Sequence, residues 1–133
     1  MTALAEALAA AQQELPIAVE RDAQGYGYRY TSLDKLIEAT RPILNKHGLS
    51  ITQWPSYVAM GDGLRATLMT MVHHISGESV NESIPLYVTD KSMQGLGAAI
   101  TYARRYAWAA ALGIASEEDT DAATLKPEDD VPF

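Results

Sequence analysis

Two adjacent arginines, Arg104 and Arg105, lie in a run from Ile100 to Gly113 whose other residues are small, apolar or aromatic. On a helix, consecutive side chains are about 100° apart, so both guanidinium groups can flank one apolar stripe, with Tyr102 and Tyr106 close by. Guanidinium groups bind phosphates in a bidentate manner and aromatic rings stack on bases, so this composition suits single-stranded nucleic acid. The alternative is structural: the arginines pair with carboxylates of a neighbouring element or subunit.

A second stretch that mixes charge with aromatic rings is "YRYTSLD", which begins at Tyr28. Tyr28, Arg29 and Tyr30 can stack on bases and neutralise phosphates of single-stranded DNA. Alternate tyrosines in a short strand can equally pack against the helix that follows, because side chains two residues apart share one face of a strand. The residues alone leave both interpretations open.

Sequence patterns typical of enzymes are absent. The chain has no cysteine, which removes thiol catalysis and cysteine-ligated zinc. No P-loop pattern occurs, and Gly95 and Gly97 are followed by Ile100 where a dinucleotide-binding fingerprint requires glycine. His73 and His74 lie on a predicted strand, where neighbouring side chains point to opposite faces and do not readily chelate one metal ion. We therefore expect a binding protein without cofactor or metal.

The formal net charge is −7 at pH 7, but the charge is unevenly distributed. Residues 116–133 contain seven acids and one base, whereas residues 1–115 contain ten acids and nine bases. The body is therefore nearly neutral and can carry a local basic groove, while the acidity belongs to a tail. No segment is apolar enough to span a bilayer, and the N-terminus lacks the basic start of a signal peptide. We expect a cytoplasmic protein.

The spacing of apolar residues predicts the elements that hold these side chains. The order of helices and strands predicts one α+β domain over residues 1–115, in which a three-stranded antiparallel sheet packs against helices on mainly one face. Residues 116–133 are expected to be a disordered acidic tail. The expected helices cover residues 2–15, 31–48 and 92–113, and the expected strands cover 49–60, 64–75 and 79–86.

Three local expectations accompany this assignment. Residues 21–27 read as a loop, because they contain two glycines and no period of two. Pro42 should kink the second helix or end its regular part. The last helix should bury one inward stripe, made of Met93, Leu96, Ile100, Ala103, Ala107 and Ala110.

Three blocks, "YRYTSLDKLIEATRPILNKHGLSITQ", "GLRATLMTMVHHISGESVNESIPL" and "QGLGAAITYARRYAWAAALGIASEEDTDA", lie in this order between Tyr26 and Ala122. Together they resemble the Erf (Essential Recombination Function) family of phage single-strand annealing proteins. The third block is the most specific, since it joins a Gln-Gly start to the double-arginine core, a Leu-Gly-Ile segment and an acidic end.

The resemblance implies ATP-independent annealing of complementary single DNA strands during phage recombination in the bacterial cytoplasm, with no enzymatic reaction. It implies a fold similar in broad plan to that of Rad-type annealing proteins, which form rings with DNA in an outer basic groove. Implied partners are single-stranded DNA, further copies of the chain in a ring or filament, and a phage exonuclease. Arg104 and Arg105 match the cationic helix positions of those relatives, and Arg65 and Lys91 are weaker DNA-binding candidates.

The chain ends in "PEDDVPF", which resembles the C-terminal tip of bacterial single-stranded DNA-binding protein (SSB). The resemblance implies binding to host proteins that read SSB tails. The terminal phenyl ring would enter an apolar pocket, and the carboxylates would meet basic residues. The acidic tail can also compete with DNA for the basic groove. The residues concerned are Asp129, Asp130, Val131, Pro132 and Phe133.

Two rival functions remain at this point. A protein that coats single-stranded DNA without annealing it would suit the tail, although the body lacks the all-β pattern of an OB barrel. A structural oligomerisation or adaptor domain without a nucleic-acid role is the other rival.

Overall fold

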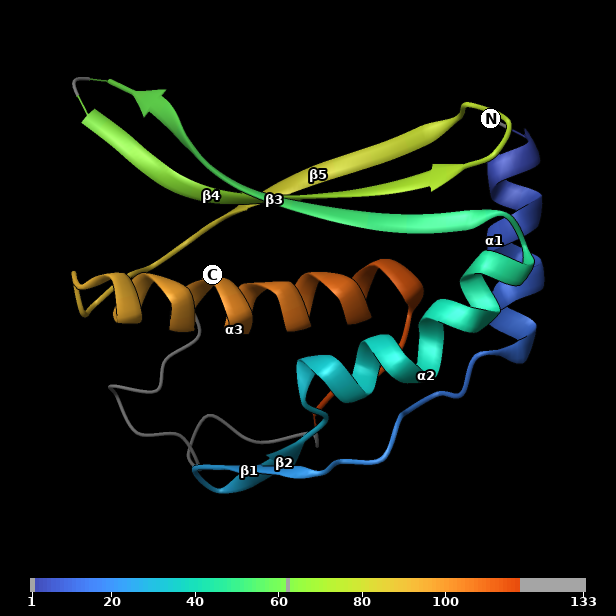
Figure 1. The fold of residues 1–133 in the computed structure, drawn as a ribbon, viewed down its shortest axis with the longest axis horizontal. Helices are drawn as coiled ribbons and strands as arrows, with labels where there is room; N and C mark the ends of the chain where they lie inside the picture. The colour runs from blue at the N-terminus through green and yellow to red at the C-terminus, as the bar shows by residue number, and fades with distance from the viewer. Residues whose placement is uncertain (1, 62, 118–133) are drawn as a thin grey trace.

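The structure is a computed structural model that describes residues 2–61 and 63–117. Within these residues it contains three helices and five strands (Figure 1). In chain order they are α1 (Thr2–Glu14), β1 (Ala23–Gly25), β2 (Tyr28–Tyr30), α2 (Leu33–Lys46), β3 (Leu49–Met60), β4 (Gly63–His74), β5 (Ser79–Pro85) and α3 (Met93–Leu112).

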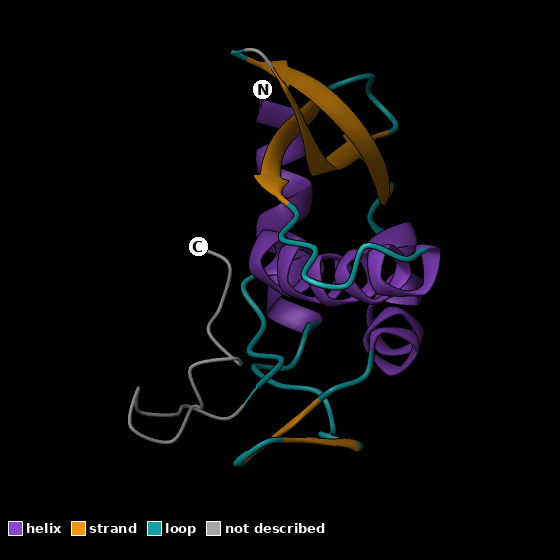
Figure 2. Cartoon of the chain, turned by 90° about the vertical axis from the view of Figure 1, so that its left-hand side faces the viewer, coloured by secondary structure: helices purple, strands orange, loops and turns teal. Residues whose placement is uncertain are grey.

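The elements form three layers (Figures 1 and 2). The antiparallel sheet β3-β4-β5 lies on one side, α2 and α3 lie beneath it, α1 stands at one end of the sheet, and the small β1-β2 hairpin lies beyond the helices. This arrangement confirms the predicted α+β class, including the three-stranded antiparallel sheet packed against helices. The three strands and three helices agree with the predicted ranges to within a few residues.

The register of the sheet explains how it tolerates a proline in each edge strand. The carbonyl oxygen of Ala66 accepts a hydrogen bond from the amide of Leu86 at 2.8 Å, so Ala66 turns its backbone groups toward the β5 side. Bonded and non-bonded pairs alternate along an antiparallel ladder. Counting along the register puts Pro55 of β3 and Pro85 of β5 in non-bonded pairs, with their nitrogens facing outward. Neither proline therefore removes a ladder hydrogen bond.

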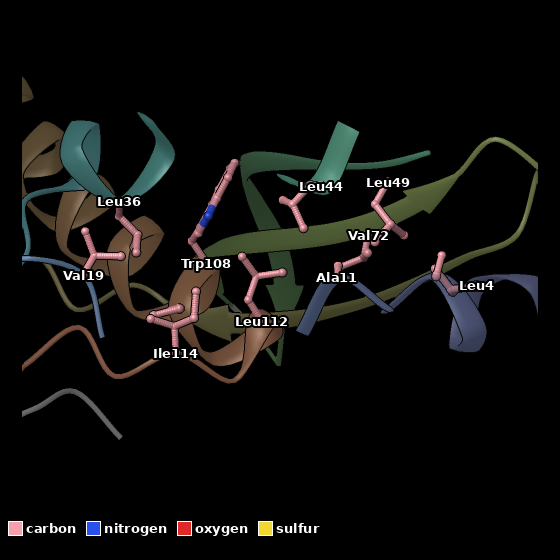
Figure 3. Packing of buried hydrophobic residues seen from close by; sticks show 12 residues of the cluster. Leu4, Ala11, Val19, Leu36, Leu44, Leu49, Val72, Trp108, Leu112 and Ile114 are labelled. Atoms are coloured by element: carbon pink, nitrogen blue, oxygen red, sulfur yellow. The ribbon is translucent and has the colours of Figure 1, made fainter. Parts of the chain in front are cut away.

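The core joins all three helices to the sheet. Figure 3 shows side chains of α1, α2, α3, β3 and β4 converging on one cluster. Trp108 of α3 is buried in this cluster, and its indole nitrogen donates to the Thr40 hydroxyl at 2.9 Å, which satisfies the polar atom that burial would otherwise leave unpaired. Burial of this large ring fixes the rotation of α3, and therefore the direction of its arginines.

Helix α3 is capped at both ends. The Ser92 hydroxyl accepts a hydrogen bond from the Gly95 amide at 3.0 Å, and Gly113 has a φ of 74° at the C-terminal end. The predicted single inward stripe is wrong at Met93, which is 81% exposed, and at Ala110, which is also exposed. The reason is that α3 buries two sides, one against the sheet and one, containing Trp108, against the other helices.

Two further expectations need correction. The predicted loop 21–27 contains β1, which pairs with β2 around Gly27, a residue with a φ of 73°. Pro42 lies inside α2, which continues to Lys46, so Pro42 does not end the helix, and the predicted alternative, a kink, stays a prediction.

The first residues that follow α3 are packed rather than extended into solvent. Ala115 forms a bridge with Ala18, and the amide of Thr31 donates to the carbonyl of Ser116 at 2.8 Å. Glu117, which the sequence analysis assigned to the tail, bridges Tyr30. The SSB-like tip lies outside the described residues.

Candidate nucleic-acid interface

The two adjacent arginines of α3 point into different environments. Arg105 is 5% exposed, and its guanidinium donates to the Glu117 carboxylate at 2.8 Å. Arg104 is only partly buried, and its Nε donates to the side-chain oxygen of Gln53 at 3.1 Å. Within this protomer Arg105 therefore has the structural role, that of pairing with a carboxylate. Arg104 keeps access to solvent.

Three tyrosine rings surround the Arg105 guanidinium. The distances from its central carbon to the ring centroids are 4.1 Å for Tyr30, 5.0 Å for Tyr102 and 5.5 Å for Tyr106. Guanidinium stacks favourably on aromatic faces, and this attraction strengthens when both partners are desolvated. Through Tyr30, Arg105 fastens the β1-β2 hairpin to α3.

Glu117 completes the same cluster. Its second carboxylate oxygen accepts a hydrogen bond from the Tyr106 hydroxyl at 2.6 Å, and the Tyr102 hydroxyl donates to Tyr106 at 3.2 Å. Burial, together with the hydrogen bonds to Glu117 and Tyr102, raises the pKa of the Tyr106 hydroxyl well above its ordinary value. Tyr106 therefore stays a neutral donor at physiological pH.

The sequence left open whether the YRY run packs inside the protein or faces DNA. In the structure its tyrosines are partly buried and its arginine is exposed. Tyr30 is half-buried against Arg105, so it packs on α3 rather than on α2, the helix that follows it. The rings of Tyr28 and Tyr30 are 5.9 Å apart, and both are partly buried. Arg29 points away from that face and is exposed. Of the three, Arg29 is the side chain most open to solvent.

Arg104 is held in place by the sheet. Gln53 of β3 accepts from Arg104 Nε and donates its amide to the Arg104 carbonyl at 3.1 Å and to the Thr70 hydroxyl at 3.1 Å. Among the described residues, no carboxylate forms an ion pair with Arg104. Its charge is thus oriented by a neutral partner and remains available to an anion.

A groove lies between the free end of the β3-β4 hairpin and the start of α3, and it contains two of the predicted cations. Arg65 of β4 and Lys91, just before α3, line this space of about 640 Å³ together with Tyr57 and Tyr87. Tyr57 is 61% exposed and Tyr87 is 53% exposed, and the Arg65 guanidinium lies 5.8 Å from the Tyr87 ring centroid. The described lining has two cations and no carboxylate. Such a surface can hold phosphates and stack bases.

β3 connects the groove to Arg104, although Arg65, which pairs with Val58, belongs to the opposite face of the sheet from Tyr57 and Gln53. Tyr57 and Gln53 are four residues apart on the helix-facing side of β3, so they are separated by about 13 Å at roughly 3.3 Å per residue. Tyr57 and Tyr87 were not among the predicted site residues, because they are far apart in the sequence and only the fold brings them to one groove. The sequence signal that could have identified them is that each tyrosine shortly precedes a candidate cation, Arg65 or Lys91.

The paired histidines show no metal site. The ring of His73 is hydrogen-bonded to the Thr52 hydroxyl at 2.8 Å, and that of His74 accepts from the Ser76 amide at 3.1 Å. Across residues 2–61 and 63–117, no group of three or more potential ligands could hold a metal ion.

Comparison with protein families decides the identity. The family model described as ERF superfamily matches residues 4–130, which is nearly the whole chain. The chain belongs to the ERF superfamily. Membership implies a recombination or annealing protein of the phage type, with DNA-related partners, in a family whose members are generally not enzymes.

Two further comparisons gave no relatives: no curated protein and no solved structure matches this ERF-superfamily chain. Among its described helices, none is both long and apolar enough to cross a membrane.

Proposed function

We propose that this ERF-superfamily protein binds single-stranded DNA and anneals complementary strands without ATP, as a recombination protein of a phage or prophage. The observation that carries the proposal is the groove with Arg65, Lys91, Tyr57 and Tyr87, whose described lining combines two cations with exposed aromatic rings and has no carboxylate. Nearby Arg104, oriented by Gln53, extends the basic surface.

The proposed mechanism uses only binding energy. Phosphates lie on Arg65, Lys91 and Arg104, and most bases face outward so that a second strand can test pairing. Pairing and stacking of the two strands supply the free energy, so nucleotide hydrolysis is unnecessary. Arg105 is left out of the proposed contact surface because Glu117 already neutralises it.

A homo-oligomer, as a ring or filament, would repeat these few cations along the DNA. The nearly neutral body then offers enough positive charge, because each further contact on the same strand forms at a high effective concentration. Affinity should accordingly rise steeply with oligonucleotide length.

Replacing both groove cations tests the proposal. In the double variant Arg65→Ala/Lys91→Ala, single-stranded DNA should bind more weakly, and the slope of log K against log salt should become shallower by about 1.4, since each phosphate contact contributes about 0.7. Fluorescence anisotropy over a salt series measures both quantities. Arg41→Ala, an exposed cation on α2, is the matched control. An unchanged slope in the double variant would contradict this site.

Annealing must be measured separately from binding. Mixing complementary oligonucleotides with a donor and an acceptor dye should give faster pairing with the protein than without it. Binding without acceleration would favour the strand-coating alternative. Absence of any salt-dependent retention on single-stranded DNA would favour the oligomerisation or adaptor alternative.

A further inference from the structure

A second recess adjoins the groove on the opposite side of Tyr87. It lies between the chain that connects β5 to α3 and the first half of α3, and its volume is about 400 Å³. We call it the Tyr87–Tyr102 slot. Its two aromatic residues are Tyr87 and Tyr102, its polar side chains are Thr89, Asp90 and Gln94, and Ala98 lies on its helical side.

Gly95 creates the slot. A Cβ atom at Gly95 would lie 2.0 Å from the Asp90 carbonyl oxygen, so only glycine lets the connection cross so close to the first turn of α3. The Asp90 side chain holds this crossing, because its Oδ1 accepts from the Ser92 amide at 3.1 Å. The neighbouring alanines are small and leave the space open.

The lining matches the chemistry of a nucleobase. Base recognition in single strands combines stacking on aromatic rings with hydrogen bonds to base edges. Tyr87 and Tyr102 supply rings, and the Tyr102 ring is held by its hydroxyl bond to Tyr106 and by Arg105. Asp90 can accept a hydrogen bond from an exocyclic amino group, and Gln94 can both donate and accept.

The position of the slot supports the same ligand. Tyr87 lines both the slot and the groove, and its ring meets the Arg65 guanidinium on the groove side. A strand whose phosphates run past Arg65 and Lys91 would therefore bring its bases next to the slot. The carboxylate of Asp90 disfavours a phosphate there, so the neutral part of a nucleotide is the better fit.

We propose that the Tyr87–Tyr102 slot takes one nucleobase per protomer from single-stranded DNA. This inference rests on the proposed function, since it needs a strand in the adjoining groove. Most bases then face outward and can pair with a second strand. The one base per protomer that occupies the slot cannot pair. Bases that carry an amino group, namely cytosine, adenine and guanine, fit Asp90 better than thymine.

The test separates bases from backbone. Two labelled oligonucleotides of equal length are compared, one of mixed sequence and one whose central tract has sugars without bases. The wild-type protein should bind the abasic strand about fivefold more weakly, the lower end of what one base stacked on an aromatic side chain is worth. Ala98→Leu, which fills the slot with a good helix former at an exposed position, should clearly reduce this preference, and any preference that remains belongs to the rings of the adjoining groove.

Ala110→Leu is the matched control, because Ala110 is exposed on the same helix and lines no part of the slot. This variant should keep the wild-type preference. Equal wild-type affinity for both oligonucleotides, or an undiminished preference in Ala98→Leu, would overturn the slot and leave the proposed function standing. Failure of the wild-type protein to bind either strand would overturn both.

Discussion

Arg104 and Arg105 differ in solvent access and in counter-charge. Arg105 has a side chain that is 6% exposed and an ion pair with Glu117, whose side chain is 17% exposed. Arg104 has a neutral partner, Gln53, and a partly exposed side chain. A cation that is buried and paired contributes to folding, whereas a cation that is oriented and open can meet a ligand.

The two alanine substitutions should therefore have different effects. Arg105→Ala leaves Glu117 without its cation and opens a space among three tyrosines, so the free energy of unfolding should fall by about 3–5 kcal/mol. Arg104→Ala removes a hydrogen bond that water can replace, so the free energy of unfolding should fall by about 1 kcal/mol. Binding of single-stranded DNA should weaken in the same variant. Urea denaturation followed by circular dichroism measures the first quantity and anisotropy the second. Equal stability losses in the two variants would contradict this assignment.

Tyr106 gives the cluster a pH dependence at the alkaline end. Its pKa is raised in the folded protein, so the unfolded state ionises first, near the ordinary value of 10.0. The stability contributed by the neutral hydroxyl is present below that pH and is lost as pH rises through the folded value. The difference in unfolding midpoint between wild type and Tyr106→Phe should narrow between about pH 9 and pH 11. A constant difference across that range would show that Tyr106 does not titrate this way.

The role of Arg105 could not be predicted from the helix alone. Its partner Glu117 lies twelve residues further along, beyond the Gly113 turn, in a segment whose composition is that of a solvated tail. The sequence left two alternatives for Arg105, binding to DNA and pairing with a carboxylate. Which one holds depends on the path of the chain after α3, and the helix sequence does not contain that information. The candidates Arg65 and Lys91 rested on a resemblance, and their proximity to Tyr57 and Tyr87 depends on tertiary packing.

At the scale of the element, α3 contains two glycines, Gly95 and Gly97. Their sequence context does not distinguish them, but they differ in the space that the structure leaves for a side chain. A Cβ at Gly95 would collide with the Asp90 backbone, whereas a Cβ at Gly97 meets no atom within 4 Å. Gly97→Ala should stabilise the protein by about 1 kcal/mol, the usual gain in a helix interior. Gly95→Ala should destabilise it instead. Thermal denaturation of the two variants provides a matched pair, and stabilisation by both would mean that the connection over α3 is easily displaced.

The longer elements and the short strand of alternate tyrosines were predictable, but its pairing partner β1 was not. The strands of the sheet run for 12, 12 and 7 residues, their sequences favour a period of two, and their turns contain glycine, so several signals agree. β1 has three residues, Ala23–Gly25, which is too short for a period to show. The hairpin is stabilised by Tyr30 on Arg105, a contact between distant parts of the chain.

At the scale of the whole molecule, the acidic tail can be tested separately from the body. Deleting Val131–Phe133 should leave annealing intact in a purified system, because the proposed groove is lined by residues between Tyr57 and Leu96. The same deletion should weaken retention of host proteins that bind SSB tails. Pull-down with full-length and shortened protein measures this, and Val131→Ala, which keeps the terminal Phe133, is a milder comparison. Equal retention of host proteins by both lengths would remove the proposed role of the tip.

The outward prolines have a consequence for how molecules of this protein meet. Pro55 and Pro85 each remove one outward hydrogen-bond donor from an edge strand of the sheet. If a strand of a neighbouring molecule paired with either edge, its carbonyl oxygen opposite the proline would receive no hydrogen bond. Backbone-to-backbone growth, the first step toward cross-β fibrils, is thereby interrupted on both sides, so a crowded preparation is protected from self-templated aggregation.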